Sequence, residues 1–574
     1  MRRGRPRNAL ARAAVAAALV LASALPPRAV AQDLSLDLPV FGHTTFSMTS
    51  TTTARYRGDN YDFNTHDDRF GSLAQRFDLA LQGDELRLEV RIDAFVPTTY
   101  LADPCAPGTE SLCYLAWDLR PERMTLRWEH ENWLVEAGDS QLVLGRSIAL
   151  AFRKVDLLGV DTALRGAHVR YQGQYVRARL HAGVANPQNQ DPIDLSIIRE
   201  FSDVVTAGTL GATLPGETRI DLGLHAANLW FADEPIGGFA QPPNRMVSIA
   251  GWSAEAPALL DGRLALYVEN DALRRVWGAQ GSGEQEFGRA TYASAQLSLD
   301  ELTVLVEWKD YDNFLVAGST DESRAWRIYG AAPSIEYEGP QRLRAIGNQR
   351  GGGVRVDYAF LPGPWSFSIN EVAYGLNEEL REDPWSGVLV SHTWATLVRR
   401  QEYAESLIWS LNFVLGWREE VLLHDPVLMP GHRAGELDRR MIHGQVEVTL
   451  GSGDHSFDIH VDHRHETQLD FSGYRQFQVG GTSVTYTFGV PLTATVGLRW
   501  SDYNLGEVTQ RSMRDYNFLG GNMYPSVEVR YSFDPGTSLR LFAGQTPGGQ
   551  ICSGGVCRVV PPFEGVLLQF VGRL

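Results

Sequence analysis

The sequence predicts an all-β protein: a large up-and-down transmembrane β-barrel of about 24 antiparallel strands (roughly 22–26), with one or two loops folded into the lumen. Two observations carry this prediction. Apolar residues recur at every second position in many segments of about ten residues, which is the pattern of strands with one face in lipid. The connections between these segments alternate between very short and long, whereas a soluble sandwich has no membrane to distinguish its two ends.

The segment Asp84–Pro97 illustrates the alternation. One face carries Leu86, Leu88, Val90, Ile92 and Ala94, and the other carries Arg87, Glu89, Arg91 and Asp93. Because successive side chains of a strand point to opposite faces, one face is apolar and the other is charged. We expect the apolar face to meet lipid and the charged face to meet the lumen. The same pattern recurs in 72–82, 124–130, 175–182, 301–310, 492–500 and 525–533.

The connections predict how the barrel is oriented. Short turns such as QGDE, HENW, LPGE and FDPG alternate with long polar loops. Outer-membrane barrels have short periplasmic turns and longer extracellular loops, so we assign the long connections to the cell exterior. These long connections are 57–70, 98–118, 140–163, 185–202, 230–243, 271–286, 312–347, 417–438, 504–522 and 548–563.

The N-terminus has the features of a secretory signal peptide. A basic start with Arg2, Arg3, Arg5, Arg7 and Arg12 precedes the apolar run AAVAAALVLASAL, and the small-residue pattern AVA ends before Gln32. The run is too short to span a bilayer comfortably, which disfavours the alternative of a membrane anchor. We therefore predict a signal peptide at 1–31, a periplasmic N-terminal segment at 32–40, and an outer-membrane β-barrel at 41–574.

Two long connections, 140–163 and 312–347, differ from ordinary exposed loops because they are rich in apolar residues. Wide barrels are commonly plugged, and a lumen lined by charged side chains offers ionic partners to a folded-in segment. The charged residues predicted to form the plug are Asp139, Arg146, Arg153, Asp156, Asp161 and Arg165. The same residues fit a second reading, a constriction that selects solutes.

Both segments resemble regions of a family of bacterial outer-membrane barrels, common in Bacteroidetes, that is described only as a domain of unknown function. The matching positions are Gly138, Asp139, Gly145, Arg153, Gly159, Asp161, Leu164, Arg165 and Gly166. The stretch YGAAPSIEYE is similar to the family's Pro-Pro loop, with Pro333 in place and Ala332 where the family has its other proline. The resemblance implies a barrel in the outer membrane and supplies no activity.

Cysteines and histidines form the remaining candidate sites. Cys105 with Cys113, and Cys552 with Cys557, each share one long loop, so we predict two local disulfides in an oxidising compartment. The alternative, one four-cysteine metal site, requires the two loops to meet. A histidine-rich stretch contains His455, His460, His463 and His465. Strand alternation places His460 and His463 on opposite faces, which opposes a single metal site.

These observations predict a porin-like or plugged channel for polar solutes in the bacterial outer membrane. The alternative is a non-conducting structural or assembly barrel of a cell-surface secretion or motility complex. No serine-hydrolase pattern is present, so we expect no enzyme activity, no catalytic residues, no cofactor and no metal site. A formal charge of −17 argues against a nucleic-acid partner. The expected partners are outer-membrane lipid and lipopolysaccharide, the barrel-assembly machinery, and a surface or periplasmic protein.

Overall fold

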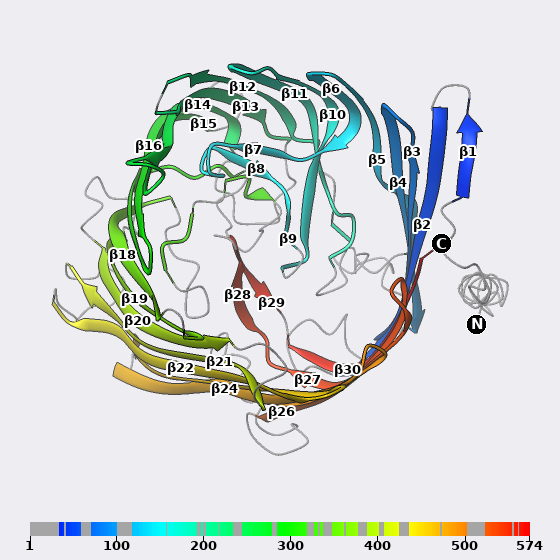
Figure 1. Ribbon diagram of the computed structural model, residues 1–574, viewed down its shortest axis with the longest axis vertical. Coiled ribbons are helices and arrows are strands. Elements are labelled where there is room, and N and C mark those ends of the chain that lie inside the picture. Colours follow the sequence, from blue (N-terminus) through cyan, green and yellow to red (C-terminus); the bar gives the residue numbers. More distant parts are fainter. Residues whose placement is uncertain are drawn as a thin grey trace, which may run out of the picture.

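The computed structural model is a closed antiparallel β-barrel of 24 strands, and Figure 1 shows it as a ring viewed along its axis. The structure describes residues 34–38, 42–58, 70–99, 117–155, 158–191, 197–198, 202–216, 218–232, 244–277, 284–317, 327–330, 333–336, 347–360, 363–376, 387–400, 407–423, 435–470, 473–501, 523–553, 556–560 and 562–573. No helix within these ranges is long and apolar enough to cross a membrane. The predicted fold class and strand number are confirmed.

The first half of the wall consists of β2 (Gly42–Arg57), β3 (Phe70–Gln82), β4 (Leu86–Thr99), β5 (Asp118–His130), β6 (Trp133–Ser140), β10 (Val160–Gln172), β11 (Val176–Pro187), β12 (Val204–Leu214), β13 (Ile220–Trp230), β14 (Asn244–Leu259), β15 (Leu264–Trp277) and β16 (Glu284–Leu299). The second half consists of β17 (Leu302–Asp312), β18 (Gln349–Phe360), β19 (Trp365–Leu376), β20 (Val388–Arg400), β21 (Ile408–Leu422), β22 (Leu437–Ser452), β23 (His455–Asp470), β24 (Gly473–Phe488), β25 (Leu492–Ser501), β26 (Met523–Asp534), β27 (Thr537–Thr546) and β30 (Phe563–Arg573).

Six further strands are not among the 24 strands of the wall. They are β1 (Leu34–Leu38), β7 (Leu142–Leu144), β8 (Leu150–Phe152), β9 (Lys154–Val155), β28 (Gly549–Ser553) and β29 (Val556–Val560). β1 pairs with the start of β2, so part of the predicted N-terminal segment 32–40 is itself a strand. β7 pairs with β8, β28 pairs with β29, and β9 pairs with the first residues of β10.

The ring closes because the last strand, β30, pairs with both β27 and β2. The closing register runs from Thr49↔Arg573 to Arg57↔Gly565. Closure leaves no free sheet edge, which is what strands need in order to cross a lipid bilayer with all their backbone groups paired.

The two faces of the strands separate as the alternation predicts. Arg91 of β4 points into the lumen, where it is 8% exposed and its Nη1 donates to Asp161 at 2.9 Å. Large apolar side chains point outward on many other strands, including Leu222, Leu224, Val306, Trp308, Phe367, Ile369, Phe413, Leu415, Val527 and Val529, all of which are exposed. Such an outer band is the lipid-facing surface of a transmembrane barrel.

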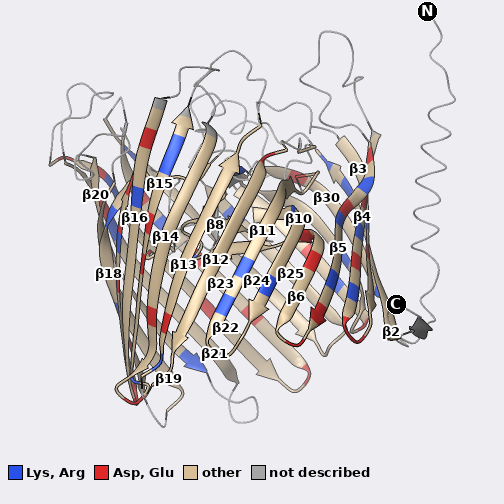
Figure 2. Ribbon diagram, turned by 90° about the horizontal axis from the view of Figure 1, so that it is seen from above, with Lys and Arg blue, Asp and Glu red and all other residues tan. Residues whose placement is uncertain are grey.

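The connections are sorted between the two ends of the barrel. Most turns at one end are tight, and Figure 2 shows these hairpins gathered at the lower end of the barrel. The opposite end carries the long connections, including 141–159 and 313–348. One connection at that end is an exception to the predicted rule, because only residues 471–472 separate β23 from β24.

We predict that Val90→Arg destabilises the barrel by about 2–4 kcal/mol, because the substitution places a charge on the lipid face. Urea unfolding of the purified barrel in lipid vesicles measures this cost. Arg87→Ala is the matched control, since Arg87 faces the lumen, pairs with Glu89 and is half exposed. We expect that control to change the free energy of unfolding by less than about 1 kcal/mol. A larger effect of Arg87→Ala than of Val90→Arg would reverse the assignment of the two faces.

Candidate functional site

The wall is interrupted where β6 meets β5. β6 pairs with β5 only from Trp133 to Gly138, whereas its pairing with β10 continues to Ser140. Gly138 has a φ of +113°, and a Cβ at this position would lie 1.9 Å from the carbonyl oxygen of Met124. A side chain is excluded here, so glycine is required. Beyond Ser140 the chain leaves the wall and enters the lumen as β7, β8 and β9 (Figure 1).

The plug hairpin, residues 142–152, consists of β7, a tight turn and β8. The turn has left-handed backbone at Gly145 (φ +57°) and at Ser147 (φ +71°). Val143 is exposed, but the larger apolar side chains of the hairpin are at most 3% exposed. These buried side chains are Leu142, Leu144, Ile148, Leu150 and Phe152.

An apolar sector of the inner wall receives the plug hairpin. It consists of lumen-facing side chains near the loop ends of β10 to β17, and it forms one buried cluster with the hairpin. Its members include Leu164, Ala185, Val205, Leu229, Val247, Ile249, Leu273 and Tyr311.

We expected a charged lumen wall to shelter the plug, and the structure differs on this point. Apolar side chains are stabilised by roughly 1.5–3 kcal/mol each when buried, so an apolar wall shelters them better than a charged one.

Arg146 lies at the tip of the plug hairpin and against the tyrosines of the wall. Its guanidinium carbon is 3.8 Å from the ring centroid of Tyr267 and 5.6 Å from that of Tyr292. Its Nη1 donates to the hydroxyl of Ser294 at 3.2 Å, and its backbone N–H donates to Glu269 at 2.9 Å. Arg146 therefore holds the tip through cation–π contacts and a main-chain hydrogen bond.

Asp139 holds the point at which the chain leaves the wall. Its carboxylate accepts hydrogen bonds from Arg165 at 3.1 Å, from Asn186 at 2.6 Å and from the backbone N–H of Met124 at 2.8 Å. Asp139 is buried, whereas Arg165 is partly exposed. The Asp139 carboxylate thus accepts a hydrogen bond from the backbone N–H of Met124 on β5, which β6 no longer pairs at this point. This backbone donor is thereby satisfied.

Asp161 holds the point at which the chain rejoins the wall. Its carboxylate lies 2.9 Å from Arg91 of β4 and 3.2 Å from Arg123 of β5. The backbone carbonyl of Arg153 accepts a hydrogen bond from the N–H of Thr162 at 3.2 Å. Asp156 lies outside the described residues. Of the six predicted charged residues, Asp139, Asp161 and Arg165 thus lie at the ends of the segment and Arg146 lies at its tip.

A second segment, the inner strap, also enters the lumen. Its described parts are 314–317, 327–330 and 333–336. Arg327 donates to the carboxylate of Asp203 at 2.9 and 3.2 Å, and the hydroxyl of Tyr329 donates to the same carboxylate at 2.8 Å. The Tyr329 ring stacks on Phe152 at 4.8 Å between centroids. The backbone N–H of Ala151 donates to the carbonyl of Tyr329 at 2.5 Å, so the plug hairpin and the strap form one unit.

Glu336 fixes the far end of the inner strap to the opposite wall. Its carboxylate accepts hydrogen bonds from Tyr374 at 2.6 Å, from His392 at 3.0 Å and from Arg418. His392 in turn lies 2.8 Å from His443. Burial raises the pKa of the Glu336 carboxyl, but Arg418 and His392 lower it further than burial raises it, and the resulting pKa is about 2.

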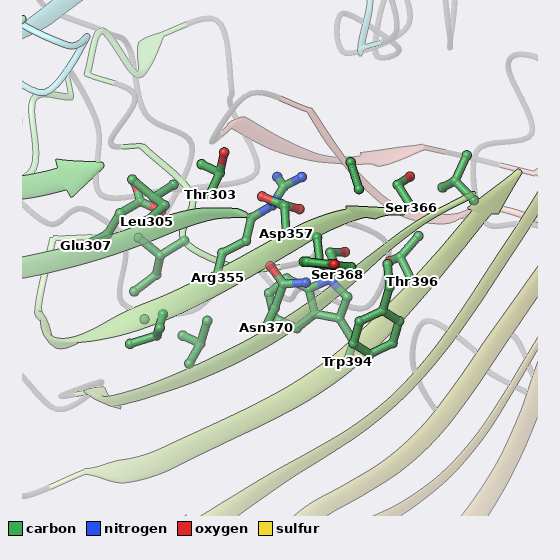
Figure 3. Close-up of a pocket in the computed structure, with 18 of the residues that line it drawn as sticks. Thr303, Leu305, Glu307, Arg355, Asp357, Ser366, Ser368, Asn370, Trp394 and Thr396 are labelled. Atoms are coloured by element: carbon green, nitrogen blue, oxygen red, sulfur yellow. Dashed lines mark hydrogen bonds and ion pairs between the residues drawn. The ribbon is translucent and has the colours of Figure 1, made fainter. Parts of the chain in front are cut away.

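Two cavities in the lumen lie beside the plug and are lined by described residues. The first, of about 760 Å³, lies against residues 334–336 of the inner strap, and Figure 3 shows its lining of hydroxyl, amide, indole and charged side chains. The lining includes Thr303, Glu307, Arg355, Asp357, Ser366, Ser368, Asn370, Trp394 and Thr396. The second, of about 750 Å³, lies beside the plug between β2–β6, β10 and β11. Its lining contains the basic residues Arg76, Arg91, Arg123, Arg127, Lys154, Arg170 and Arg179.

The structure separates the predicted histidine cluster. His460 lies 3.2 Å from Glu447 and 3.0 Å from Asp462, whereas His463 accepts a hydrogen bond from the indole of Trp500 at 3.3 Å. His455 contacts the hydroxyl of Tyr486 at 2.7 Å. The opposite placement of His460 and His463 is confirmed.

The predicted disulfides are described only in part. The register of β28 and β29 places Cys552 opposite Cys557, and this hairpin falls within the ring when the barrel is viewed along its axis (Figure 1). Cys105 and Cys113 lie outside the described residues. Both disulfides stay predictions.

Sequence reasoning did not identify the residues that hold the inner strap, namely Asp203, Arg327, Tyr329, Glu336 and Arg418. The only available signal was that 312–347 is too apolar for an exposed loop. The partners lie far apart in the chain, since 124 positions separate Asp203 from Arg327 and 82 separate Glu336 from Arg418. No local pattern reports contacts over such separations.

Comparison with known proteins shows only a coarse likeness. Neither the protein-family models nor the curated proteins gave a match. Among solved structures, the P pilus usher (PapC) translocation pore aligns over 92% of this chain and 99% of its own, with 8% identity and a TM-score of 0.35. The siderophore receptor PirA from Pseudomonas aeruginosa covers 92% and 80%, with 7% identity and a TM-score of 0.46. OccAB3 from Acinetobacter baumannii covers 70% and 98%, with 11% identity and a TM-score of 0.34. Similarities this weak support no conclusion about function.

We predict that docking of the inner strap depends on the charge of Glu336. Because the folded-state pKa is below the ordinary value of 4.5, the stabilisation is complete above about pH 4.5 and is lost as the pH falls toward 2. Glu336→Gln should cost about 3–5 kcal/mol of docking free energy at neutral pH, because it removes one of the two carboxylates that pair with the buried Arg418 guanidinium. Hydrogen exchange at the amides of Ser334, Ile335 and Glu336, corrected for the intrinsic rate at each pH, measures both effects. The exposed residue Glu301 supplies the control, and Glu301→Gln should leave the exchange unchanged. Equal protection at pH 2 and pH 6 would contradict the prediction.

Proposed function

We propose that the protein is a plugged outer-membrane channel, and that polar solutes cross it past the plug hairpin and the inner strap through the two lumen cavities. The observation that carries the proposal is a closed barrel in which folded-in segments fill one apolar sector and leave polar cavities on either side. A barrel that serves only as a scaffold has no need of polar cavities at membrane depth. In this proposal, the charged residues predicted for the plug hold its ends to the wall and fix its tip.

The linings of both cavities support polar solutes, but their fixed charges differ, because the first contains the five carboxylates Asp300, Glu301, Glu307, Glu336 and Asp357 against Arg355 alone. The first cavity offers Ser366, Ser368, Asn370 and Thr396 as hydrogen-bonding groups beside the flat indole of Trp394. The second is lined by seven Arg and Lys side chains against five carboxylates, Asp78, Glu89, Glu136, Asp139 and Asp161. The excess of fixed positive charge in the second cavity attracts anions, whereas the excess of carboxylates in the first attracts cations.

The outward apolar band supports a location in the bacterial outer membrane, with lipid and lipopolysaccharide around the barrel. The short turns would then face the periplasm and the long connections the cell exterior. The predicted signal peptide, residues 1–31, and insertion by the barrel-assembly machinery belong to the same proposal, as does the resemblance to the uncharacterised barrel family.

The alternative role, a non-conducting assembly barrel for a surface complex, makes the opposite prediction for conductance. Such a barrel keeps its lumen closed and uses its loops as the contact surface. One conductance experiment therefore separates the two roles.

We predict that replacing residues 142–155 with a short Gly/Ser linker raises single-channel conductance several-fold in planar bilayers. The replacement removes the plug hairpin from the lumen and thereby widens the route. The intact barrel should conduct weakly, and a reversal potential measured across a salt gradient shows whether the basic or the acidic cavity dominates its charge selectivity.

The matched control shortens the connection between β21 and β22, residues 424–434, by a similar number of residues. We expect this control to conduct like the intact protein, provided that both variants keep the heat-modifiable migration of a folded barrel on gels. A plug-less barrel that is folded and still does not conduct would exclude the channel role and favour the assembly role.

We also predict the orientation. An epitope tag inserted between Gly173 and Gln174, in the short turn joining β10 and β11, should be inaccessible to antibody in intact cells. A tag inserted in 424–434 should be accessible under the same conditions. Labelling of the first tag and not of the second would show that the barrel has the opposite orientation in the membrane.

A further inference from the structure

A niche in the inner wall brings three ligand-type side chains together below the plug hairpin. The register aligns His225 of β13, Gly251 of β14 and Asp271 of β15 in one row. His225 Nε2 lies 2.5 Å from Asp271 Oδ1, across the intervening strand. A Cβ on Gly251 would lie 1.9 Å from that oxygen and 2.4 Å from that nitrogen. The niche therefore exists because the middle strand carries glycine at this position.

Glu269, two residues before Asp271 on β15, completes the group. One ligand atom from each of His225, Glu269 and Asp271 lies within 4.8 Å of the other two. Glu269 and Asp271 are both 0% exposed. Within the described residues, Glu269 Oε1 and Asp271 Oδ2 have no hydrogen-bond partner. Two buried carboxylates with unsatisfied oxygens are costly unless a cation or a proton compensates them.

We propose that His225, Glu269 and Asp271 bind a divalent transition-metal cation, for which Zn²⁺ is the probe. Zn²⁺ accepts one imidazole nitrogen and carboxylate oxygens as ligands at about 2.0–2.2 Å, so binding requires His225 Nε2 and Asp271 Oδ1 to move apart from their present 2.5 Å as the cation enters between them. Imidazole favours transition metals over Ca²⁺ and Mg²⁺, which prefer ligand sets made only of oxygen. The unsatisfied oxygens of Glu269 and Asp271 are the atoms to which such a cation would bind.

The site is joined directly to the plug hairpin. The second oxygen of Glu269 accepts the backbone N–H of Arg146 at 2.9 Å. A Cβ on Gly145 would lie 1.7 Å from Glu269 Oε1, so the turn of the hairpin closes over the carboxylate. A bound cation thus fixes the Glu269 side chain on which the hairpin tip rests. This consequence for the plug rests on the proposed channel function, whereas cation binding itself does not.

The experiment titrates Zn²⁺ into the untagged, full-length mature barrel in detergent after chelator treatment and dialysis, and follows binding by calorimetry. Co²⁺ is titrated in parallel, because its visible absorption reports the ligand set. We expect one saturable site in the wild-type protein. Asp271→Asn should weaken binding about 100-fold or more, since it replaces a charged ligand with a neutral amide.

Gly251→Ala tests the site without removing a ligand. The added methyl group enters the space between His225 and Asp271, so binding should be lost while all three ligands remain. Gly211→Ala on the neighbouring strand β12 is the matched control. A Cβ there meets the flexible Arg177 side chain at 3.4 Å, and we expect binding as in the wild type.

Absence of saturable Zn²⁺ or Co²⁺ binding to the folded wild-type barrel would overturn the proposal and leave a shared proton or a buried water as the compensation. Equal binding by the wild type and by Gly251→Ala would overturn it as well, because the cation would then sit elsewhere. Neither outcome bears on conductance, so failure of the metal site and failure of the channel role are distinguishable.

Discussion

The pairing of β30 with β2 is the interaction on which the rest of the structure depends. Backbone polar groups cannot be left unpaired in lipid, so a sheet can span the membrane only as a closed ring. Nine register positions join the first and last strands of the wall, and the side chain of Gln569 adds a hydrogen bond to Thr53 at 3.3 Å. Once the ring is closed, only its outer face must suit lipid, and the inner face is free to vary from sector to sector.

The side chains of the inner wall differ from sector to sector, and this difference divides the lumen. Near the loop ends of β10 to β17 it is apolar and holds the plug hairpin, whereas β17 to β20 and β2 to β6 line polar cavities. The inner strap links these sectors, because Arg327 is bound at Asp203 of the apolar side and Glu336 at Arg418 of the other. A wide barrel is thus reduced to narrow passages by a small number of side-chain contacts.

Strand alternation and connection lengths were sufficient to predict the barrel, its strand number and the faces of strands such as β4. The apolar inner sector was not predictable in the same way. In β13, Ala227 and Leu229 face the lumen while Leu224 and Ala226 face outward, so the period-two signal is weak where both faces are apolar. The contacts of Glu336 and the niche around Gly251 depend on register between strands, which a single sequence does not encode locally. Asp139 and Asp161 were found because they flank an unusual segment.

The apolar seating of the plug hairpin determines how often the lumen opens unaided. Uncovering its five large buried side chains at about 2 kcal/mol each costs about 10 kcal/mol, before the wall side chains are counted. Release of the hairpin also returns conformational entropy to its backbone, roughly 1–2 kcal/mol per residue, and this gain opposes the burial cost. The population of the displaced state is set by the difference between these two opposing terms, and each step of about 1.4 kcal/mol in that difference changes it tenfold.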